Sequence, residues 1–383
     1  MSTVNNGPQI VRSGLVLDLD ASYMRSYSPN VMPNPTDIFA WCGSSGVNCT
    51  LSRDTTMTRQ YGSIPLKMVV SANDPNMSTY NSPTWNLAPA ATGQTWTVSV
   101  YVKASVATNV EGPVIFECNS SGTYLAATSA GSISVTTSWT RISYSVTFGN
   151  ASTAFIQVRL DGTSTGGSGI TIWWDGLQVE RSSSATTFNP YYFGNTVWKD
   201  VSGNNRTGTL TGGPLFNTSN NGSIVFDGST QYVTTSNIAL SFTTFSMECL
   251  VKYNSLSGNQ GLFTYNNTNV INLWKGSGLG MRWEVNTSSQ AITGANDLAT
   301  GVWYHFVGVY NGSQGILYRN GVVYAGPTTL TSHTSEAANF EIGRYNGAGN
   351  TNGSIAIAKF YTRALTAAEV SQNYEATKTR FGL

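Results

Sequence analysis

Two carboxylates in the N-terminal segment are the first residues of this chain that could do chemistry. Asp18 and Asp20 lie two positions apart in LVLDLDAS, and on an extended strand this spacing puts both side chains on one face. Two carboxylates held near each other can act as the acid and the base of a glycoside hydrolase. The alternative is a structural or cation-binding role for the same pair, which is the reading we favour.

The two histidines lie in settings that favour structural roles. His305 belongs to WYHFVGVY, an alternating pattern in which Val307 and Val309 share its face, and His333 belongs to the Ser/Thr-rich segment TSHTSEA. A catalytic triad needs a base and a group that orients it, and the sequence identifies neither. It also lacks nucleophile elbows, zinc-protease motifs and phosphate-binding Gly-Lys loops. The sequence therefore predicts a protein that is not an enzyme.

The cysteines do not predict a metal site. Cys42, Cys49, Cys118 and Cys249 form no CxxC pair, and the chain has only 2 histidines, so zinc is not expected. Cys42 and Cys49 are close enough in sequence to bridge. However, the first residues show no basic start followed by an apolar run, so we expect synthesis in a cytoplasm, which disfavours a disulfide. Buried thiols are the expectation.

Composition favours two β-rich domains. The 383 residues are too many for one ordinary core. Charged residues make up only 10%, and polarity comes from Ser, Thr, Asn and 39 glycines, which suits short strands joined by turns. The net charge is +1 without a basic run, so nucleic acid is not an expected partner. No apolar stretch is long enough to cross a membrane, so a membrane is not an expected partner either.

Alternating apolar and polar residues predict strands in two groups. TWTVSVYVKAS, RISYSVTF, FIQVRLDG and GITIWWDGLQVE form the first group, and short strands from GSIVFDGSTQYV to SIAIAKFYTRAL form the second. Asn320-Gly321 predicts a type I′ hairpin turn. Thr366 and Glu369 predict a capping box that begins one short C-terminal helix. The expected fold class is all-β, with two antiparallel β-sandwich (jelly-roll) domains and this helix.

The second group resembles a laminin-G-like, concanavalin A-like jelly roll. The resemblance is carried by SIVFDGSTQYV, FSMECLVKY, WYHFVGVYNGSQGILYRNGVVY and the closing AIAKFYTRALTAAEV. In that family, as it occurs in marine tailed bacteriophages, an opening like GLVLDLDAS is followed shortly by a segment like VWKDVSGNN. Here the first strand group separates the two. The resemblance thus implies a jelly roll formed by residues 1–30 and 191–383, with residues 31–190 inserted in a surface loop.

The inserted segment resembles the carbohydrate-binding-module-like jelly rolls of phage structural proteins. The resemblance is carried by TWTVSVYVKAS, SWTRISYSVTF and GITIWWDGLQVERSSSATTFNP. Such jelly rolls often hold a structural Ca²⁺ with loop carboxylates and backbone carbonyls. The resemblance assigns Asp175 in WWDG to the ligand position, where Gly176 predicts a bulge. Asp227 in FDGS is the counterpart in the other domain. The alternative at both positions is an Asp-Gly turn.

Sugar binding is expected from side chains out of phase with the core of the inserted domain. Flat sugar faces stack on aromatic rings, and sugar hydroxyls pair with amide and charged groups. The candidates are Tyr101, Gln157, Arg159 and Trp173, which we expect on the concave side of this domain. The alternatives are that they cover the sheet or pack against a neighbouring subunit.

The resemblance implies a non-enzymatic phage virion protein, made in the host cytoplasm and located on the particle as a capsid decoration, head-fibre or tail-fibre component. Its expected partners are other virion proteins, further copies of itself in an oligomer such as a trimer, and host surface glycans bound weakly but many times over. Two alternatives stay open. The first is a free lectin-like carbohydrate-binding protein, and the second is a glycan-active enzyme.

Overall fold

The computed structural model divides the chain into two compact units. One unit, here called the host unit, is formed by Met1–Tyr27 and Thr196–Leu383, and the other, the inserted unit, by Ser28–Asn195. The sequence predicted a division at residues 30/31 and 190/191, three residues after the first of these boundaries and five residues before the second. The structure describes residues 9–22, 27, 30–33, 35–57, 63–77, 83–163, 167–189, 196–217, 219–236, 242–266, 270–331, 333, 337–345 and 347–383.

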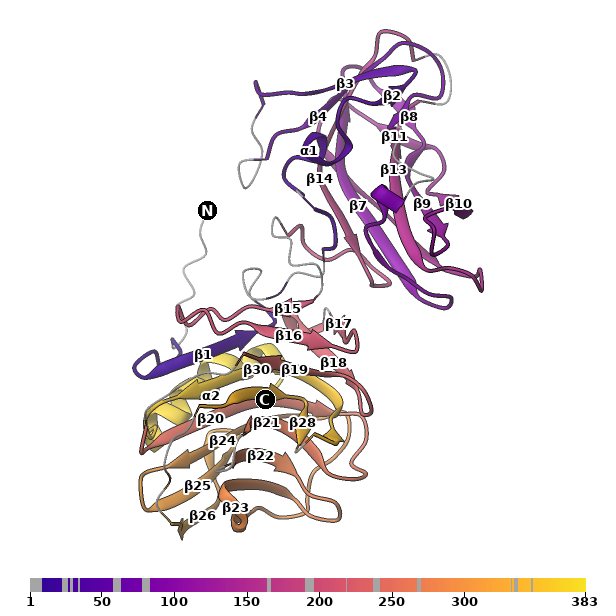
Figure 1. The fold of residues 1–383 in the computed structure, drawn as a ribbon. Helices are drawn as coiled ribbons and strands as arrows, with labels where there is room; N and C mark the ends of the chain where they lie inside the picture. The colour runs from indigo at the N-terminus through magenta and orange to yellow at the C-terminus, as the bar shows by residue number, and fades with distance from the viewer. Residues whose placement is uncertain are drawn as a thin grey trace. The chain divides into compact units, whose positions relative to one another are not determined.

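The host unit is a sandwich of two large antiparallel sheets (Figure 1). The eight-stranded sheet runs in the order β17 (Leu215–Asn217), β18 (Ser223–Asp227), β30 (Asn352–Tyr361), β20 (Phe245–Tyr253), β24 (Trp303–Tyr310), β25 (Gln314–Arg319) and β26 (Val322–Thr329), with β1 (Leu15–Asp20) paired to β30. The seven-stranded sheet runs β15 (Val197–Trp198), β16 (Gly208–Thr211), β19 (Tyr232–Thr235), β27 (Asn339–Ile342), β21 (Gln260–Asn266), β22 (Val270–Lys275) and β23 (Met281–Thr293). A small hairpin joins β28 (Arg344–Tyr345) to β29 (Gly349–Asn350).

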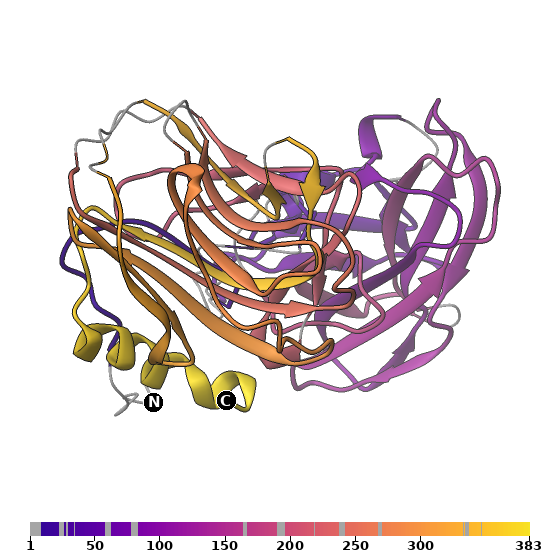
Figure 2. The same cartoon turned by 90° about the horizontal axis from the view of Figure 1, so that it is seen from below.

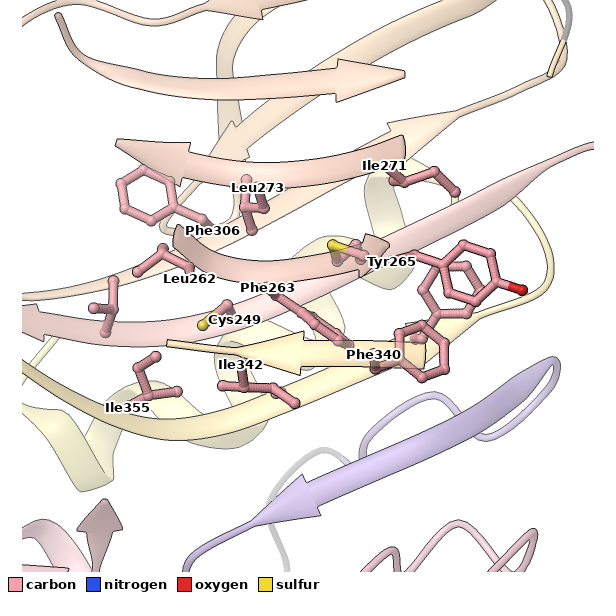
Figure 3. Close-up of a cluster of buried hydrophobic side chains, with 14 of the residues drawn as sticks. Cys249, Leu262, Phe263, Tyr265, Ile271, Leu273, Phe306, Phe340, Ile342 and Ile355 are labelled. Carbon is pink, nitrogen blue, oxygen red and sulfur yellow. The ribbon is translucent and has the colours of Figure 1, made fainter. Parts of the chain in front are cut away.

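Apolar side chains from both sheets form the core of the host unit. Figure 3 shows Cys249 and Ile355 from the eight-stranded sheet near Phe263 and Ile342 from the seven-stranded sheet. All four are completely buried. The alternation of their strands produces this arrangement, because successive residues point to opposite faces and the apolar ones meet between the sheets.

Two local predictions for the host unit are confirmed. Asn320 and Gly321 connect β25 to β26 with φ angles of 50° and 79°, as a type I′ turn requires. Helix α2 (Ala367–Phe381) begins with a complete capping box, in which Thr366 Oγ1 accepts from the Glu369 amide at 3.2 Å and Glu369 Oε2 accepts from the Thr366 amide at 2.9 Å. Within the described residues, no helix is long and apolar enough to span a membrane.

Helix α2 lies against the outer face of the eight-stranded sheet (Figure 2). Its buried residues include Val370, which packs in one cluster with Val307 of β24, and Phe381, which packs against Trp303 of β24. The helix therefore covers the face of this sheet that points away from the core.

The inserted unit is a second antiparallel sandwich, so the all-β fold class with two sandwiches and a C-terminal helix is confirmed. Its five-stranded sheet runs β12 (Thr140–Thr147), β7 (Thr95–Ala104), β14 (Thr171–Glu180), β4 (Leu66–Val70) and β3 (Cys49–Arg53). Its six-stranded sheet runs β10 (Tyr124–Ser129), β9 (Gly112–Cys118), β13 (Phe155–Asp161), β5 (Asn76–Met77) and β2 (Gly46–Val47), with β6 (Ala88–Pro89) paired to β13. β8 (Thr108–Val110) pairs with β11 (Ile133–Val135).

The sequence did not predict the short helix α1 (Ile38–Cys42) of this unit. Asp37 caps it, because the Asp37 side chain accepts a hydrogen bond from the Ala40 amide. A five-residue helix is too short to show a 3.6-residue apolar period, so pattern reasoning has nothing to detect here.

Candidate functional site

The structure places the four predicted sugar-binding residues on two different sheets. Tyr101 lies on β7 and Trp173 on β14, in the five-stranded sheet. Gln157 and Arg159 lie on β13 of the six-stranded sheet, where the alternate residues of the strand form the core. The expectation that all four line one concave face is therefore wrong, because the two pairs point outward from opposite sides of the sandwich.

Gln157 and Arg159 are held by neighbouring residues of their own unit. Gln157 is completely buried, and its Nε2 donates to Asn86 Oδ1 at 2.8 Å. The guanidinium of Arg159 makes two hydrogen bonds of 2.6 Å to the Asp161 carboxylate and lies over the Phe116 ring. These contacts correspond to the alternative reading of the sequence, in which such residues cover their sheet.

Tyr101 and Trp173 belong to a group of aromatic and basic side chains that the strand register brings together. Arg141, Tyr101 and Asp175 form one cross-strand row over β12, β7 and β14. Lys103, Trp173 and Lys67 form the next row over β7, β14 and β4. Residues directly opposite each other in paired strands point to the same face. The partly exposed members of this face, called the aromatic–basic face below, are Lys67, Tyr101, Lys103, Trp139, Arg141 and Trp173.

Two indole rings flank one ammonium group on the aromatic–basic face. Lys103 Nζ lies 4.8 Å from the ring centroid of Trp173 and 5.5 Å from that of Trp139, so both contacts are cation–π interactions. Trp173 Nε1 donates to Asp54 Oδ2 at 2.8 Å. Hydrogen bonds from Thr56 and then from Trp173 lower the pKa of Asp54, so this carboxylate stays charged and fixes the orientation of the Trp173 ring.

Arg141 and Tyr101 occupy the other end of this face. The Arg141 guanidinium lies 5.7 Å from the Tyr101 ring centroid, and its Nη2 donates to Ser99 Oγ at 2.8 Å. Arg141 Nε is buried, and within the described residues it has no hydrogen-bond acceptor. Phe188 packs edge-on against Tyr101. The buried Nε is closed to a bound molecule, so such a molecule would meet the partly exposed part of the guanidinium.

The bulge predicted at Gly176 is present, but Asp175 does not join a cluster of acids. Gly176 has a φ of 59°, and the register between β14 and β7 shifts between Asp175 and Gln178. The Asp175 carboxylate is only 2% exposed and accepts a 2.8 Å hydrogen bond from Ser63 Oγ. Among the described residues there is no group of three or more His, Cys, Asp or Glu side chains that could hold a metal ion.

Asp227 stabilises a turn, which was the alternative reading of this position. Its Oδ1 accepts from the Ser229 and Thr230 amides at 2.8 and 2.9 Å, and its Oδ2 accepts from Thr230 Oγ1. Burial alone would raise the pKa of Asp227, but hydrogen bonds from Ser229, Thr230 and Gln231 hold it well below its usual value. Both carboxylate oxygens are therefore used by the loop itself.

The carboxylate pair of β1 lies between the eight-stranded sheet and α2. Asp18 is completely buried and sits opposite Lys359 of β30 in the strand register. Burial raises the pKa of Asp18 to about 6, although the charge of Lys359 opposes the rise. Asp20 forms a 2.9 Å ion pair with Arg380 of α2. Asp20 thus has a basic partner from another element, whereas both oxygens of the Asp18 carboxylate are buried without a hydrogen-bond partner among the described residues.

His305 belongs to the same buried cluster. Its Nε2 lies 3.3 Å from Glu248 Oε1, and Lys359 Nζ lies 3.1 Å from that oxygen. Asn373 of α2 donates to Glu248 Oε2 at 2.6 Å. Burial would raise the pKa of Glu248, but the charge of Lys359 and the contact with His305 lower it to about 2. Helix α2 covers this cluster, and its Tyr374 ring lies 5.8 Å from the His305 ring, so the histidine packs against the helix as a structural residue.

His333 is also buried. Its ring stacks on Phe242 with a centroid separation of 5.4 Å, and its Nδ1 lies 2.6 Å from Asn286 Oδ1. Burial lowers the pKa of His333 to about 4. The ring is therefore neutral near pH 7 and packs as part of the core.

Sequence reasoning missed a polar row on the outer face of the seven-stranded sheet. The register aligns Glu341, Thr264, Asn272 and Glu284 across β27, β21, β22 and β23. Burial raises the pKa of Glu284, which accepts a 3.2 Å hydrogen bond from Asn272. The sequence carries a signal for this row. In INLWK and MRWEV, Asn272 and Glu284 alternate with apolar residues, which indicates that they point away from the core.

A further aromatic contact lies next to this row. The Trp274 ring stacks on Tyr345 of β28 at 4.2 Å. Arg344, the neighbour of Tyr345, forms an ion pair with Glu341. The β28–β29 hairpin thus supplies side chains that cover the buried acids of this face.

Comparisons with known proteins concern the fold. Residues 227–371 match the model of the concanavalin A-like lectin/glucanases superfamily, which is less than half of the chain. No curated protein matches the sequence. Among solved structures, domain 4 of an extracellular arabinanase from Geobacillus stearothermophilus, in complex with arabinotriose, is 21% identical with a TM-score of 0.40, over 46% of this chain and 92% of that one.

Two other similar structures are binding domains of botulinum neurotoxins. The binding domain of botulinum neurotoxin serotype G is 17% identical, with a TM-score of 0.37, over 46% of this chain and 47% of that one. The binding domain of botulinum neurotoxin DC is 13% identical, with a TM-score of 0.38, over 47% and 48% of the two chains. The chain thus spans about half the length of these toxin domains. Together, the strand order and the family match show a concanavalin A-like jelly-roll fold for the host unit.

Proposed function

We propose that this protein is a non-enzymatic carbohydrate-binding protein that holds glycans on the aromatic–basic face of its inserted unit. The observation that carries the proposal is the fixed Trp173 ring beside Lys103 and Trp139. Sugar rings present flat apolar faces that stack on indoles, while polar groups at the edge of the site orient the hydroxyls. The match of the host unit to a superfamily that includes lectins supports the same class of function.

The contacts of the acids support a binding role over a hydrolytic one. Asp20 and Glu248 are paired with Arg380 and Lys359 under α2, and Glu341 is paired with Arg344. Glu284, whose pKa burial raises, is almost completely buried and lies 3.6 Å from Arg282. A glycoside hydrolase instead needs two carboxyl groups on either side of a bound sugar, one of them free to give up a proton. We therefore propose that bound glycans leave the protein uncleaved.

The setting that we propose is the surface of a bacteriophage particle, on the strength of the family resemblance in the sequence. Several copies per particle would bind weakly at each site, and multivalency would supply the overall affinity. Mass spectrometry of purified particles tests this setting, and stoichiometric amounts of the chain are expected. If the chain is absent from particles, the virion setting is wrong, and the proposal becomes a free lectin-like protein.

Glycan binding is tested with a multimerised form of the full chain on a glycan array. Trp173→Ala should weaken the binding of the array's best glycan about tenfold or more, because aromatic anchors of an interface cost more than 1 kcal/mol when truncated. Tyr124→Ala is the matched control, since Tyr124 is 47% exposed on the other sheet of the same unit. Array signals that are absent, or equal loss in both variants, would contradict the proposal. An assay for new reducing ends tests the non-enzymatic part, and no release is expected.

A further inference from the structure

The charges that the aromatic–basic face presents to solvent are positive. Lys67, Lys103 and Arg141 are each partly exposed there. The nearby acids are more deeply placed, with Asp54 8% and Asp175 2% exposed. Since only 10% of the whole chain is charged and the net charge is +1, three basic side chains in two adjacent rows of one sheet are a local concentration of charge.

The acids of this face are already used by other groups. The Asp54 carboxylate accepts hydrogen bonds from Thr56 and Trp173, and the charge of Lys67 also lowers its pKa. The charge of Arg141 lowers the pKa of Glu180, although burial raises it overall. Glu180 is completely buried and accepts hydrogen bonds from Gln178 and Thr186. Lys67 is therefore partly compensated, whereas Lys103 and Arg141 carry most of the uncompensated charge.

Lys103 and Arg141 make no ion pair within the described residues. The contacts of Lys103 Nζ are with the two indole rings, which attract a cation but do not neutralise it. Arg141 donates from Nη2 to Ser99, and its buried Nε has no acceptor in the described part of the chain. A guanidinium binds a carboxylate through two parallel hydrogen bonds, and an ammonium binds it as a point charge. Both groups thus lack the partner that a carboxylate would provide.

The strand geometry places an aromatic surface between these two cations. Tyr101 lies directly opposite Arg141 in the register and two residues before Lys103 on the same strand. Two residues of a strand span about 7 Å. Trp173 lies directly opposite Lys103 in the register. A ligand that bridges Arg141 and Lys103 therefore lies beside Tyr101 and Trp173, where flat ring faces would add stacking to the charge contacts.

We propose that the ligand of the aromatic–basic face is an acidic polysaccharide of the polyuronate class. Its carboxylates bind Arg141 and Lys103, while its sugar rings lie on Tyr101 and Trp173. This inference rests on the proposed function and narrows it from glycans in general to those with a carboxylate on the sugar ring.

The experiment compares one polymer backbone with and without its charge. Isothermal titration calorimetry of the full chain is carried out with polygalacturonate and with fully methyl-esterified polygalacturonate, and alginate is a second polyuronate. We expect the esterified polymer to bind at least about tenfold more weakly, since ester formation removes the charge-assisted contacts. We also expect polygalacturonate to bind more weakly as salt rises from about 0.1 to about 1 M, where the Debye length falls from about 10 to about 3 Å.

Variants test the two cations. Lys103→Gln and Arg141→Gln should each lower the affinity for polygalacturonate about fivefold to tenfold, a larger loss than either causes for the esterified polymer. Arg141→Lys should recover only part of the loss, because a lysine cannot bind a carboxylate through two parallel hydrogen bonds. Lys378→Gln is the matched control, because it removes the same charge from the surface of α2, where Lys378 pairs with Glu375. Circular dichroism shows whether each variant is folded, and the salt dependence of the unaltered chain tests the inference without any variant.

The outcomes separate the two proposals. Equal affinity for the charged and esterified polymers, or binding of neutral array glycans with no binding of either polyuronate, overturns this inference and leaves the proposed function standing. No binding of polyuronates or of any array glycan overturns the proposed function itself.

Discussion

Lys359 Nζ lies 3.1 Å from Glu248 Oε1, and both side chains are almost completely buried beneath helix α2. The two residues face each other across β30 and β20, and Asp18 of β1 faces the same lysine from its other side. The ammonium group pairs with Glu248, whereas the buried Asp18 carboxylate feels its charge without a hydrogen bond to it. Burial would lower the pKa of Lys359, but the charges of Glu248 and Asp18 raise it well above its usual value, so the lysine stays charged.

Loss of this lysine should destabilise the host unit strongly. Lys359→Met leaves buried carboxylates without their cation, and removal of one member of a buried ion pair costs about 3–5 kcal/mol. Guanidinium denaturation measures the free energy of unfolding, and Lys378→Met, which removes an exposed lysine of α2, is the control. The double variant Lys359→Met with Glu248→Gln should lose less stability than the single variant, because it removes one of the buried carboxylates as well as the lysine. Unfolding at the same denaturant concentration in the single variant and the unaltered chain would refute the stabilising role.

Asp18 should make stability depend on pH in the opposite sense to most carboxylates. Its pKa is raised from 3.8 to about 6 in the folded chain, so the folded state binds the proton more tightly than the unfolded state. Its contribution to stability is greatest below about pH 4 and is lost as the pH rises towards 6. Asp18→Asn has no such loss. At pH 7 its free energy of unfolding should therefore exceed that of the unaltered chain by about 1–3 kcal/mol. Calorimetric melting between pH 4 and pH 7 measures the effect, and parallel curves for the two proteins would contradict it.

Gly176 should matter both for strain and for the aromatic–basic face. Its φ is +59°, and a Cβ at this position would lie 3.2 Å from Phe188 and from Tyr101. Gly176→Ala should cost about 1–2 kcal/mol from the left-handed conformation alone, and it should also weaken glycan binding because the Tyr101 ring must move. Gly169→Ala is the control, since φ there is +85° with nothing within 4 Å of the added Cβ. If both variants lose equal stability and neither loses affinity, the contact with Tyr101 is unimportant.

The capping box should contribute a smaller, local stabilisation. Thr366→Ala removes the hydroxyl that accepts from the Glu369 amide, and loss of such a cap costs about 1 kcal/mol. Thr366→Ser keeps the hydroxyl and should be close to neutral. Hydrogen exchange of the first turn of α2 reports the change directly, and unchanged protection in Thr366→Ala would show that packing alone holds this end of the helix.

The sequence predicted those features that depend on near neighbours in the chain. The type I′ turn at Asn320-Gly321, the bulge at Gly176 and the capping box at Thr366 each need only a few adjacent residues of the right kind. The alternation of TWTVSVYVKAS likewise placed Val98 and Val100 in the core, where both are completely buried. Such patterns are readable because the backbone geometry of one segment fixes which way its own side chains point.

The composition of the candidate site depended on tertiary structure. Alternation showed that Tyr101 and Gln157 both point away from a core, but it could not show that they lie on opposite sheets. Strand pairing decides this, because it is set by contacts between segments far apart in the chain. The pairing of β7 with β12 and β14 joins Tyr101 and Lys103 to Arg141 and Trp173. In the same way, only the register of β1, β30 and β20 brings Asp18 and Glu248 to one lysine.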